Sequence, residues 1–205
     1  MLRRLTVILI AGILAIAGLL AYSGGIDQPA PDVPPIDAGS GPATAAPQAP
    51  SPVDPAGPGL PSGPTPTAEA AAVVRVVDGD TLVVDRGNGD ERVRLVGVDT
   101  PETVQPNAPV ECFGPEASAY VTDLLAGQTV SLDLDPSQGD TDRYGRLLRY
   151  VWVATDAGGW SSVEALLLSG GLAEPYRDAH SRKTGFDALA AAAQAAGRGL
   201  WSACS

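Results

Sequence analysis

Histidine and cysteine are almost absent from this 205-residue sequence, which contains one histidine and two cysteines. The single histidine, His180, excludes metal centres and proton relays that need two imidazoles. Two cysteines exclude a four-cysteine zinc site and a disulfide-dense miniprotein. Any metal site in this chain must therefore be built mainly from oxygen ligands.

Positive charge is also scarce, with 13 Lys and Arg residues against 24 Asp and Glu residues and a net charge of −11. Proteins that bind nucleic acids generally have a basic footprint. The acidic balance therefore argues against a general nucleic-acid binder. Hydrophobic residues make up 44% of the chain and charged residues 18%, which excludes a fully disordered protein.

The prolines are unevenly distributed, since 13 of the 19 lie in residues 24–70. That segment contains no lysine, arginine or aromatic residue. It cannot bury enough apolar surface to offset the entropy of ordering, so a semi-extended, disordered linker is predicted. Residues 71–205 remain as a folded domain that is long enough to bury a core.

Residues 1–23 have the pattern of a targeting segment. Arg3 and Arg4 precede an uncharged apolar run over 5–22, which is barely long enough to span a bilayer. The pattern fits a cleaved signal peptide or an uncleaved signal anchor. In both cases the arginines place the N-terminus in the cytoplasm, so the domain is expected to be secreted or membrane-anchored outside the cytoplasm.

Short runs rich in valine, separated by turn residues, predict the strands of the domain. The first three form a meander with Asn88-Gly89, a preferred hairpin dipeptide, in its second turn. The expected strands cover residues 72–77, 81–86, 92–98, 128–134 and 147–154.

Three helices are expected, over 116–125, 161–169 and 186–196. Pro115 favours the start of the first helix and Gly127 ends it. Five strands with one helix after the third and two at the end predict a mainly β fold with α-helices. The expected architecture is a five-stranded oligonucleotide-binding-type (OB-fold) barrel with three helices, preceded by the N-terminal apolar helix and the linker.

Cys112 and Cys204 are the only cysteines. In an exported protein such a pair usually forms a disulfide, which here would tie the loop before the first helix to the C-terminal tail. The alternative is two free thiols.

Three short motifs contain the residues that could bind a cation or a phosphate or take up a proton. Asp80 and Asp99, at strand ends or turns, could share a hard cation such as calcium. Arg94 and Arg146 provide planar forks that suit phosphate oxygens, and Glu102 could accept a proton from water. A cation, a base and two arginines are the groups needed to add water to a phosphodiester. Taken singly, each motif fits a turn, a helix cap or a surface strand.

Together these motifs resemble the thermonuclease, or staphylococcal nuclease-like, family. The resemblance covers about residues 72–203. The matching motifs are Asp-Gly-Asp-Thr (78–81), Arg-Leu-x-x-Val-Asp-Thr-Pro-Glu-Thr (94–103), Gly-Pro-Glu-Ala-Ser (114–118) and Asp-Arg-Tyr-Gly-Arg (142–146).

The resemblance implies an OB-type barrel and calcium-dependent hydrolysis of DNA and RNA to products that end in a 3′-phosphate. Asp80 and Asp99 resemble the carboxylate ligands of calcium, and Thr100 resembles the ligand that gives its backbone carbonyl. Glu102 resembles the residue that activates water. Arg94 and Arg146 resemble the arginines that stabilise the phosphate transition state.

The resemblance also extends to substrate-binding residues. Tyr144 resembles the tyrosine near the terminal phosphate, and Tyr176 is a candidate for base stacking. Arg143 is expected to add positive charge near the substrate, and His180 is expected at the surface without a catalytic role. The uncharged loop 104–110 and the lysine-poor, acidic domain depart from the family's basic member and predict looser substrate binding.

Two other hypotheses belong to different classes. The barrel could be a non-catalytic nucleic-acid-binding module, although such a module would be expected to have lost Glu102 or an arginine. It could instead be a cell-surface interaction protein held out by its linker. No sequence feature indicates an oligomer, so a monomer is expected.

Overall fold

The computed structural model describes residues 57–104 and 108–204. The apolar segment 1–23 and the linker residues 24–56 lie outside the described residues, so their predictions stand as predictions. None of the helices in the described part is long and apolar enough to cross a membrane.

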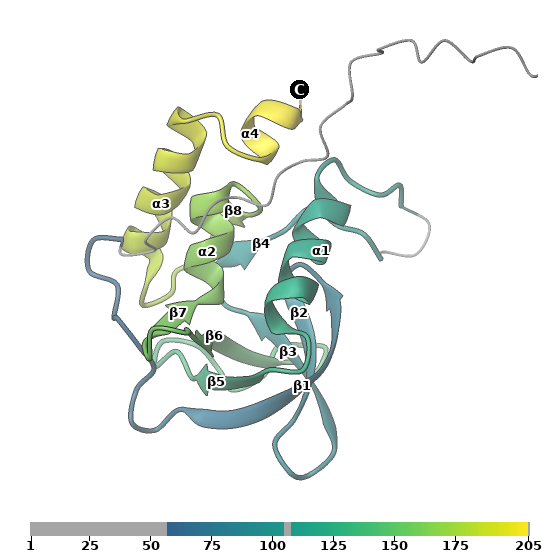
Figure 1. The fold of residues 1–205 in the computed structure, drawn as a ribbon, viewed down its shortest axis with the longest axis vertical. Coiled ribbons are helices and arrows are strands. Elements are labelled where there is room, and N and C mark those ends of the chain that lie inside the picture. The colour runs from purple at the N-terminus through teal and green to yellow at the C-terminus, as the bar shows by residue number, and fades with distance from the viewer. Residues whose placement is uncertain (1–56, 105–107, 205) are drawn as a thin grey trace, which may run out of the picture. The chain divides into compact units, whose positions relative to one another are not determined.

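Five strands close into a barrel (Figure 1). The first three form an antiparallel meander, the third pairs in parallel with the strand that begins at Leu147, and that strand returns through the remaining strand to the first. The predicted five-stranded OB-type barrel is confirmed. Its strands are β1 (Glu69–Asp78), β2 (Thr81–Asp85), β3 (Asp90–Leu95), β5 (Thr129–Asp133) and β6 (Leu147–Ala154).

The barrel interior is filled by aliphatic side chains at alternate strand positions, as the two-residue period of a strand requires. Leu82 and Val84 on β2 and Val93 on β3 are completely buried. The β2–β3 turn is held by Asp85, whose Oδ1 accepts bonds from the backbone N–H groups of Gly87 and Gly89. The predicted hairpin around Asn88-Gly89 is thus stabilised by the Asp85 side chain, and its two glycines adopt positive φ.

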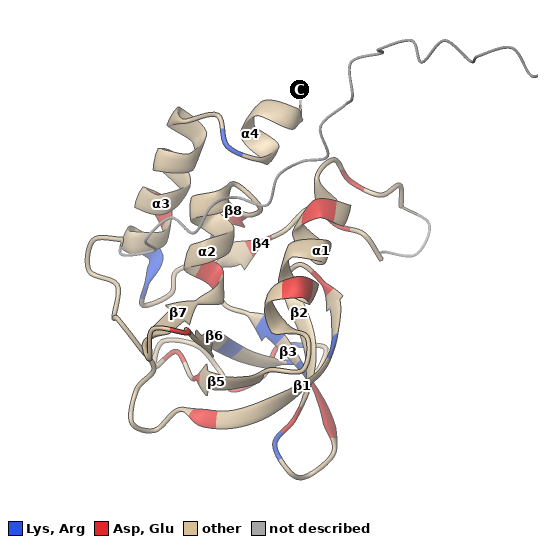
Figure 2. Cartoon of the chain, in the orientation of Figure 1, with Lys and Arg blue, Asp and Glu red and all other residues tan. Residues whose placement is uncertain are grey.

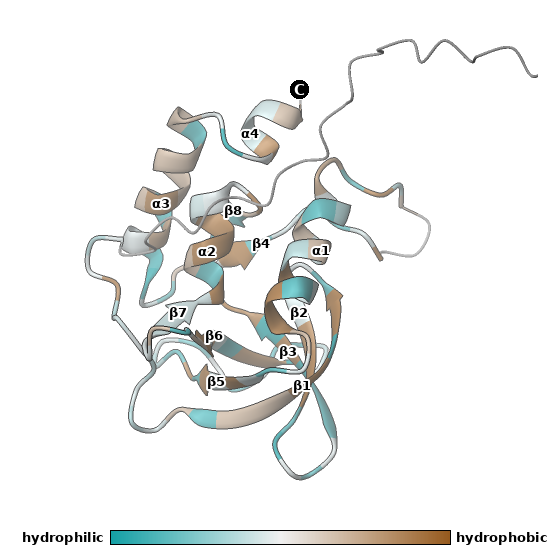
Figure 3. Ribbon diagram, viewed as in Figure 1, coloured by the Kyte–Doolittle hydropathy of each residue, from teal (hydrophilic) through white to brown (hydrophobic). Residues whose placement is uncertain are grey.

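Four helices pack outside the barrel strands, namely α1 (Gly114–Leu125), α2 (Val163–Gly170), α3 (Lys183–Ala195) and α4 (Leu200–Ala203). The sequence predicted the first three. The short α4 was missed because one turn of helix carries no periodic signal. Figure 3 shows hydrophobic residues in α2 as well as in the barrel strands. Every residue of α2 is buried, and α2 packs against β6 and α3.

The segment 160–162 is a strand, β7 (Trp160–Ser162), although the predicted helix began at residue 161. β7 adds to the sheet beside β6, with Ser162 opposite Trp152. The helix starts two residues later than predicted, at Val163, because Ser162 is its N-cap and accepts a bond from the Ala165 N–H.

The predicted third strand, 92–98, is divided at Gly97. β3 ends at Leu95, and β4 (Val98–Asp99) pairs instead with β8 (Glu174–Pro175). Gly97 has φ of 84°, and a Cβ there would lie 2.5 Å from Cε1 of His180. The break therefore depends on the close approach of a distant segment, which no local pattern reveals.

The packed structure begins before residue 71, the predicted start of the folded domain. Thr65 donates to Asp133 from its backbone N–H at 3.1 Å and from its hydroxyl at 2.5 Å. Leu60 packs against the hydrophobic core. The proline-rich composition concealed these two anchoring side chains, and residues 57–70 belong to the domain.

His180 is buried, with 8% of its surface exposed, so the predicted surface position is wrong. The Tyr150 hydroxyl donates to Asp135 Oδ2 at 2.6 Å and lies 3.0 Å from His180 Nδ1. Because the tyrosine proton goes to Asp135, Nδ1 of His180 must be the protonated donor in the second contact. A polar network between β6 and the segment before α3 thus buries the histidine.

The C-terminal tail is joined covalently to the loop before α1. Cys112 and Cys204 form a disulfide with their Cα atoms 5.8 Å apart, which is the pairing expected from the sequence. The bond connects α4 with the chain segment that follows the candidate active-site motif.

Candidate active site

The residues singled out from the sequence gather at one cleft of about 700 Å³. It is formed by the β1–β2 turn, the end of β3, β4, the turn before β6 and the segment after β8. Figure 2 marks the positions of the basic residues along the ribbon, among them those of β3, and Arg94 of β3 is one of the three arginines that line the cleft, with Arg143 and Arg146. All nine predicted site residues line this cleft: Asp80, Arg94, Asp99, Thr100, Glu102, Arg143, Tyr144, Arg146 and Tyr176.

Asp80 is positioned by the tight turn between β1 and β2. Its carboxylate Oδ2 accepts bonds from the Thr100 N–H at 3.1 Å and the Thr100 hydroxyl at 3.2 Å. Gly79 makes this contact possible, since a Cβ on Gly79 would lie 2.8 Å from the Thr100 side chain. The glycine of the Asp-Gly-Asp motif therefore brings two motifs that are distant in sequence into contact.

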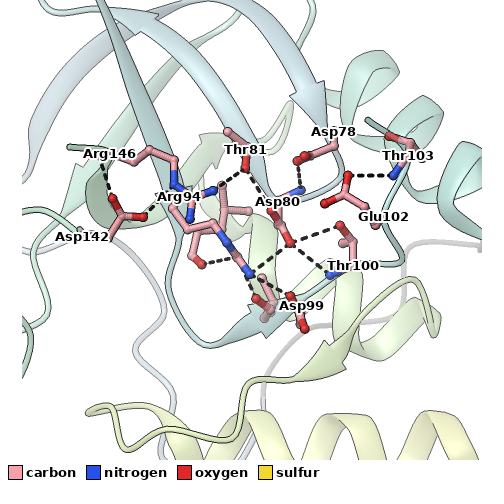
Figure 4. Close-up of polar contacts among 12 residues, drawn as sticks. Asp78, Asp80, Thr81, Arg94, Asp99, Thr100, Glu102, Thr103, Asp142 and Arg146 are labelled. Carbon is pink, nitrogen blue, oxygen red and sulfur yellow. Dashed lines mark hydrogen bonds and ion pairs between the residues drawn. The ribbon is translucent and has the colours of Figure 1, made fainter. Parts of the chain in front are cut away.

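Arg94 lies between the two predicted metal-binding carboxylates (Figure 4). Its Nη2 is 3.1 Å from Asp80 Oδ2 and 2.9 Å from Asp99 Oδ1. Its Nη1 donates to two backbone carbonyls, those of Leu95 and Val98, each at 2.8 Å. The guanidinium is thus fixed by four contacts, and the two carboxylates converge on a single point.

The donor set at this point fits a hard cation. Asp80 and Asp99 offer carboxylate oxygens, and no thiolate or second imidazole is available in the sequence for a soft metal. Among residues 57–104 and 108–204, no cluster of three or more His, Cys, Asp or Glu side chains is arranged to hold a metal. A cation here would need carbonyl and water ligands in addition, which calcium accepts readily.

Asp78 is a third carboxylate at the cleft, and the sequence interpretation gave it no role. It is 8% exposed, and its Oδ1 accepts a bond from the Asp80 N–H at 3.2 Å. Burial, together with the charge of Asp80, raises the pKa of Asp78 to about 6, against the opposing effect of that hydrogen bond. The Asp-Gly-Asp pattern itself was the signal, because both aspartates flank one turn.

Arg146 is held by Asp142, which also received no role from the sequence. Arg146 Nε donates to Asp142 Oδ2 at 2.7 Å, and Asp142 Oδ1 accepts the N–H groups of Tyr144 and Arg146. Burial acts to raise the pKa of Asp142, but these bonds from Arg146 and Tyr144 outweigh it and lower the pKa. Asp142 therefore shapes the turn and orients the arginine at once.

Two tyrosines present exposed rings at the cleft. Tyr144 is 68% exposed, and the guanidinium carbons of Arg143 and Arg146 lie 4.7 and 5.5 Å from its ring centroid. Tyr176 is 42% exposed and lies 5.8 Å from the guanidinium carbon of Arg94. An exposed ring beside arginines can stack on a flat, electron-rich group and accommodate a neighbouring anion.

Glu102 follows β4 in a loop that bends back on itself. Its Oε1 accepts the N–H groups of Thr103 at 2.9 Å and Val104 at 2.8 Å. The backbone of Glu102 is also bonded to Glu111, a further cleft residue that the sequence interpretation missed. The cleft thus combines a locally oriented carboxylate, two anchored arginines and a pair of converging aspartates.

Comparison with known proteins accounts for this combination. Residues 92–203, more than half of the chain, match the family described as staphylococcal nuclease homologue. The chain belongs to the staphylococcal nuclease family. The family match begins within β3 and includes every predicted residue of the cleft except Asp80.

Individual relatives agree with this membership. The chain is 49% identical over 88 residues to the thermonuclease of Staphylococcus intermedius, covering 43% of this chain and 51% of that protein. It is 41% identical over 100 residues to endonuclease YncB of Bacillus subtilis (strain 168), covering 48% and 44%. It is also 35% identical over 136 residues to protein ParB of Escherichia coli, covering 63% and 71%. The chain thus spans about half the length of these Staphylococcus and Bacillus relatives.

Proposed function

We propose that this protein is a calcium-dependent nuclease that hydrolyses phosphodiester bonds of DNA, RNA or both. The observation that carries the proposal is the gathering of Glu102, Arg94, Arg146 and the Asp80–Asp99 pair around one cleft. The names of relatives, a thermonuclease and an endonuclease, support the same reaction class.

Arg94 and Arg146 bind the phosphate in this proposal. Each is anchored on one side, Arg94 by backbone carbonyls and Arg146 by Asp142, so its orientation is set before substrate binds. Preorganised donors of this kind stabilise charge that develops in a transition state. With a cation held by Asp80 and Asp99, Arg94 would exchange its ion pairs with these carboxylates for a phosphate oxygen.

Asp80, Asp99 and the Thr100 carbonyl would hold calcium, which supplies Lewis-acid stabilisation of charge on the phosphate. Glu102 accepts the proton of the attacking water as the new oxygen–phosphorus bond forms. The bond between phosphorus and the 5′ oxygen breaks, the 5′ oxygen takes a proton from solvent to become a 5′-hydroxyl, and the other product strand ends in a 3′-phosphate. Tyr144 and Tyr176 stack on or flank the nucleotide, and Arg143 adds positive charge beside it.

The test is cleavage of single-stranded DNA and RNA by the purified protein with calcium, with EDTA, and with calcium restored after EDTA. Glu102→Gln is expected to lower kcat by about 10²–10⁴-fold, the usual contribution of a general base. Glu116→Gln, which changes an equal charge on α1 away from the cleft, is the matched control and should retain activity. Oligonucleotide binding without turnover would identify a non-catalytic binding module instead.

We also propose that the domain acts outside the cytoplasm, secreted or membrane-anchored. The Cys112–Cys204 disulfide supports this, because such bonds persist mainly in oxidising compartments. The apolar run 5–22 behind Arg3 and Arg4 supports it independently. N-terminal sequencing of protein from the native envelope distinguishes a cleaved signal from an anchor, and free thiols in a cytosolic fraction would contradict export.

A further inference from the structure

Two hydrogen bonds connect Glu102 with Glu111, and this pair of bonds is called the clasp below. The Glu102 N–H donates to Glu111 Oε2 at 2.9 Å, and the Glu111 N–H donates to the Glu102 carbonyl at 2.9 Å. One bond depends on the Glu111 side chain and the other does not. Glu111 therefore fixes the backbone of residue 102 from a position nine residues later in the chain.

The direction of the Glu102 side chain depends on this backbone. Its Oε1 is bonded to the N–H groups of Thr103 and Val104, which immediately follow it. A rotation of the peptide before Glu102 would move these donors and the carboxylate together. The two bonds to Glu111 thus hold the backbone of Glu102, and through it the orientation of the Glu102 carboxylate.

The first residue of helix α1 packs against the clasp. The Gly114 N–H donates to the Glu111 carbonyl at 3.1 Å. A Cβ on Gly114 would lie 2.9 Å from the Pro101 carbonyl and 3.2 Å from the Glu102 carbonyl, so the helix start is packed directly on this backbone. The first residue of α1 therefore contacts both sides of the clasp.

The disulfide fastens the residue next to Glu111 to the helical part of the fold. Cys112 is bonded to Cys204, at the end of α4. The first residue of α4, Leu200, donates its N–H to the carbonyl of Gly171 at 2.9 Å, and Gly171 is the C-cap of the buried helix α2. A continuous series of bonds thus runs from the core helix to the loop that carries Glu102.

We propose that Glu111 is a positioning residue that holds Glu102 in its reactive orientation, and that the Cys112–Cys204 disulfide anchors Glu111 for this purpose. The inference rests on the proposed function, in which Glu102 activates water. It adds a dependence of the reaction rate on a residue and a covalent bond that do not contact the reacting atoms.

Glu111 could alternatively act through its charge, because it lines the cleft and its charge acts on Asp99. The two roles differ in what a glutamine would preserve. A glutamine at position 111 keeps an oxygen that can accept the Glu102 N–H but removes the negative charge. Glu111→Gln and Glu111→Ala therefore separate hydrogen bonding from electrostatics.

The experiment measures kcat and KM of the full chain on single-stranded DNA with saturating calcium. Glu111→Ala should lower kcat by about 10- to 100-fold, the range expected from a small misplacement of a catalytic group, with KM within about threefold. Glu111→Gln should stay within about threefold of the wild type, and Glu116→Ala is the matched control on α1. The urea midpoint should hardly change, because Glu111 is exposed.

Three outcomes of this experiment overturn the proposal. Equal losses in Glu111→Gln and Glu111→Ala indicate an electrostatic role. A raised KM with unchanged kcat indicates a substrate contact. No loss in Glu111→Ala shows that the clasp is dispensable. An inactive wild-type protein, by contrast, contradicts the proposed function itself, so the two failures are distinguishable.

The disulfide arm uses the double variant Cys112→Ser/Cys204→Ser and the wild type reduced by a phosphine. Both should lose kcat to about the extent of Glu111→Ala, because all three changes release the same element. Adding Glu111→Ala to the double variant should then cause no further large loss. A multiplicative loss, or full activity after reduction, shows that the disulfide does not act through Glu111.

Discussion

The buried carboxyl group of Glu164 gives a quantitative test of the fold. Glu164 lies in the first turn of α2 and is completely buried. Its Oε1 accepts the Val151 N–H at 2.8 Å, and its Oε2 lies 2.7 Å from the Ser162 hydroxyl. It thus joins α2 to the barrel strand β6, in surroundings where a charge is poorly solvated.

Burial raises the pKa of Glu164 from its ordinary value of 4.5 to about 7, against the lowering effects of the Ser162 hydrogen bond and the Arg182 charge. Between these two pH values the unfolded chain has lost a proton that the folded protein retains. The contribution of Glu164 to the free energy of unfolding is therefore fully present below pH 4.5, and it is lost as the pH rises to about 7. At about 1.4 kcal/mol for each pKa unit, the loss is about 3 kcal/mol.

Glu164→Gln removes this pH dependence while keeping the shape and the acceptor for Val151. The free energy of unfolding, measured by urea titration with tryptophan fluorescence from pH 4.5 to 8, should diverge between the two proteins. The wild type should lose about 3 kcal/mol relative to the variant as the pH rises. Other titrating groups are common to both proteins and cancel in the difference.

A constant difference across this pH range would refute the reasoning, because it would mean that Glu164 titrates alike in the folded and unfolded states. A difference of opposite sign would show that the carboxylate is net stabilising in place. The second result would assign the dominant effect to the attraction of Arg182 rather than to burial.

Two further predictions concern the arginine anchor and the disulfide. Arg146→Lys should lower kcat by about 10²-fold with little change in KM, because an ammonium cannot bond Asp142 and also present a planar fork to phosphate. Single-turnover cleavage measures the change in rate, and a change in KM alone would contradict the prediction. Reduction of Cys112–Cys204, which closes a loop with a sequence separation of 92, should lower the free energy of unfolding by up to about 4–5 kcal/mol. Urea titration with and without reductant measures it, and an unchanged midpoint would contradict it.

Local patterns were sufficient to predict the barrel. The valine-rich runs and the Asn88-Gly89 turn carry the two-residue period and the hairpin chemistry in the sequence itself. The site residues gather because they stand at the ends and turns of a meander, where neighbouring strands bring them to one side. This is why motifs as distant as Asp80 and Arg146 could be expected near each other.

Features that depend on distant partners could not be predicted in this way. The break at Gly97 exists because His180 packs against it, and β7 exists because β6 continues beyond its pairing with β3 and leaves an edge free at 152–154. The residues before β1 are ordered by Asp133, whose position is known only once the barrel has closed. In each case the tertiary partner overrides a weak local preference.

The charge distribution explains how an acidic chain could serve the proposed reaction. Several arginines are neutralised in ion pairs away from the cleft, as Arg86 is by Glu69 and Glu91, and Arg182 by Asp133. These side chains add little to the field that a polyanion meets at a distance. The arginines of the cleft are few but anchored, so their orientation rather than their number provides the attraction. We therefore expect substrate affinity to depend on short-range contacts that form only inside the cleft, and looser substrate binding than in a basic relative stays a prediction.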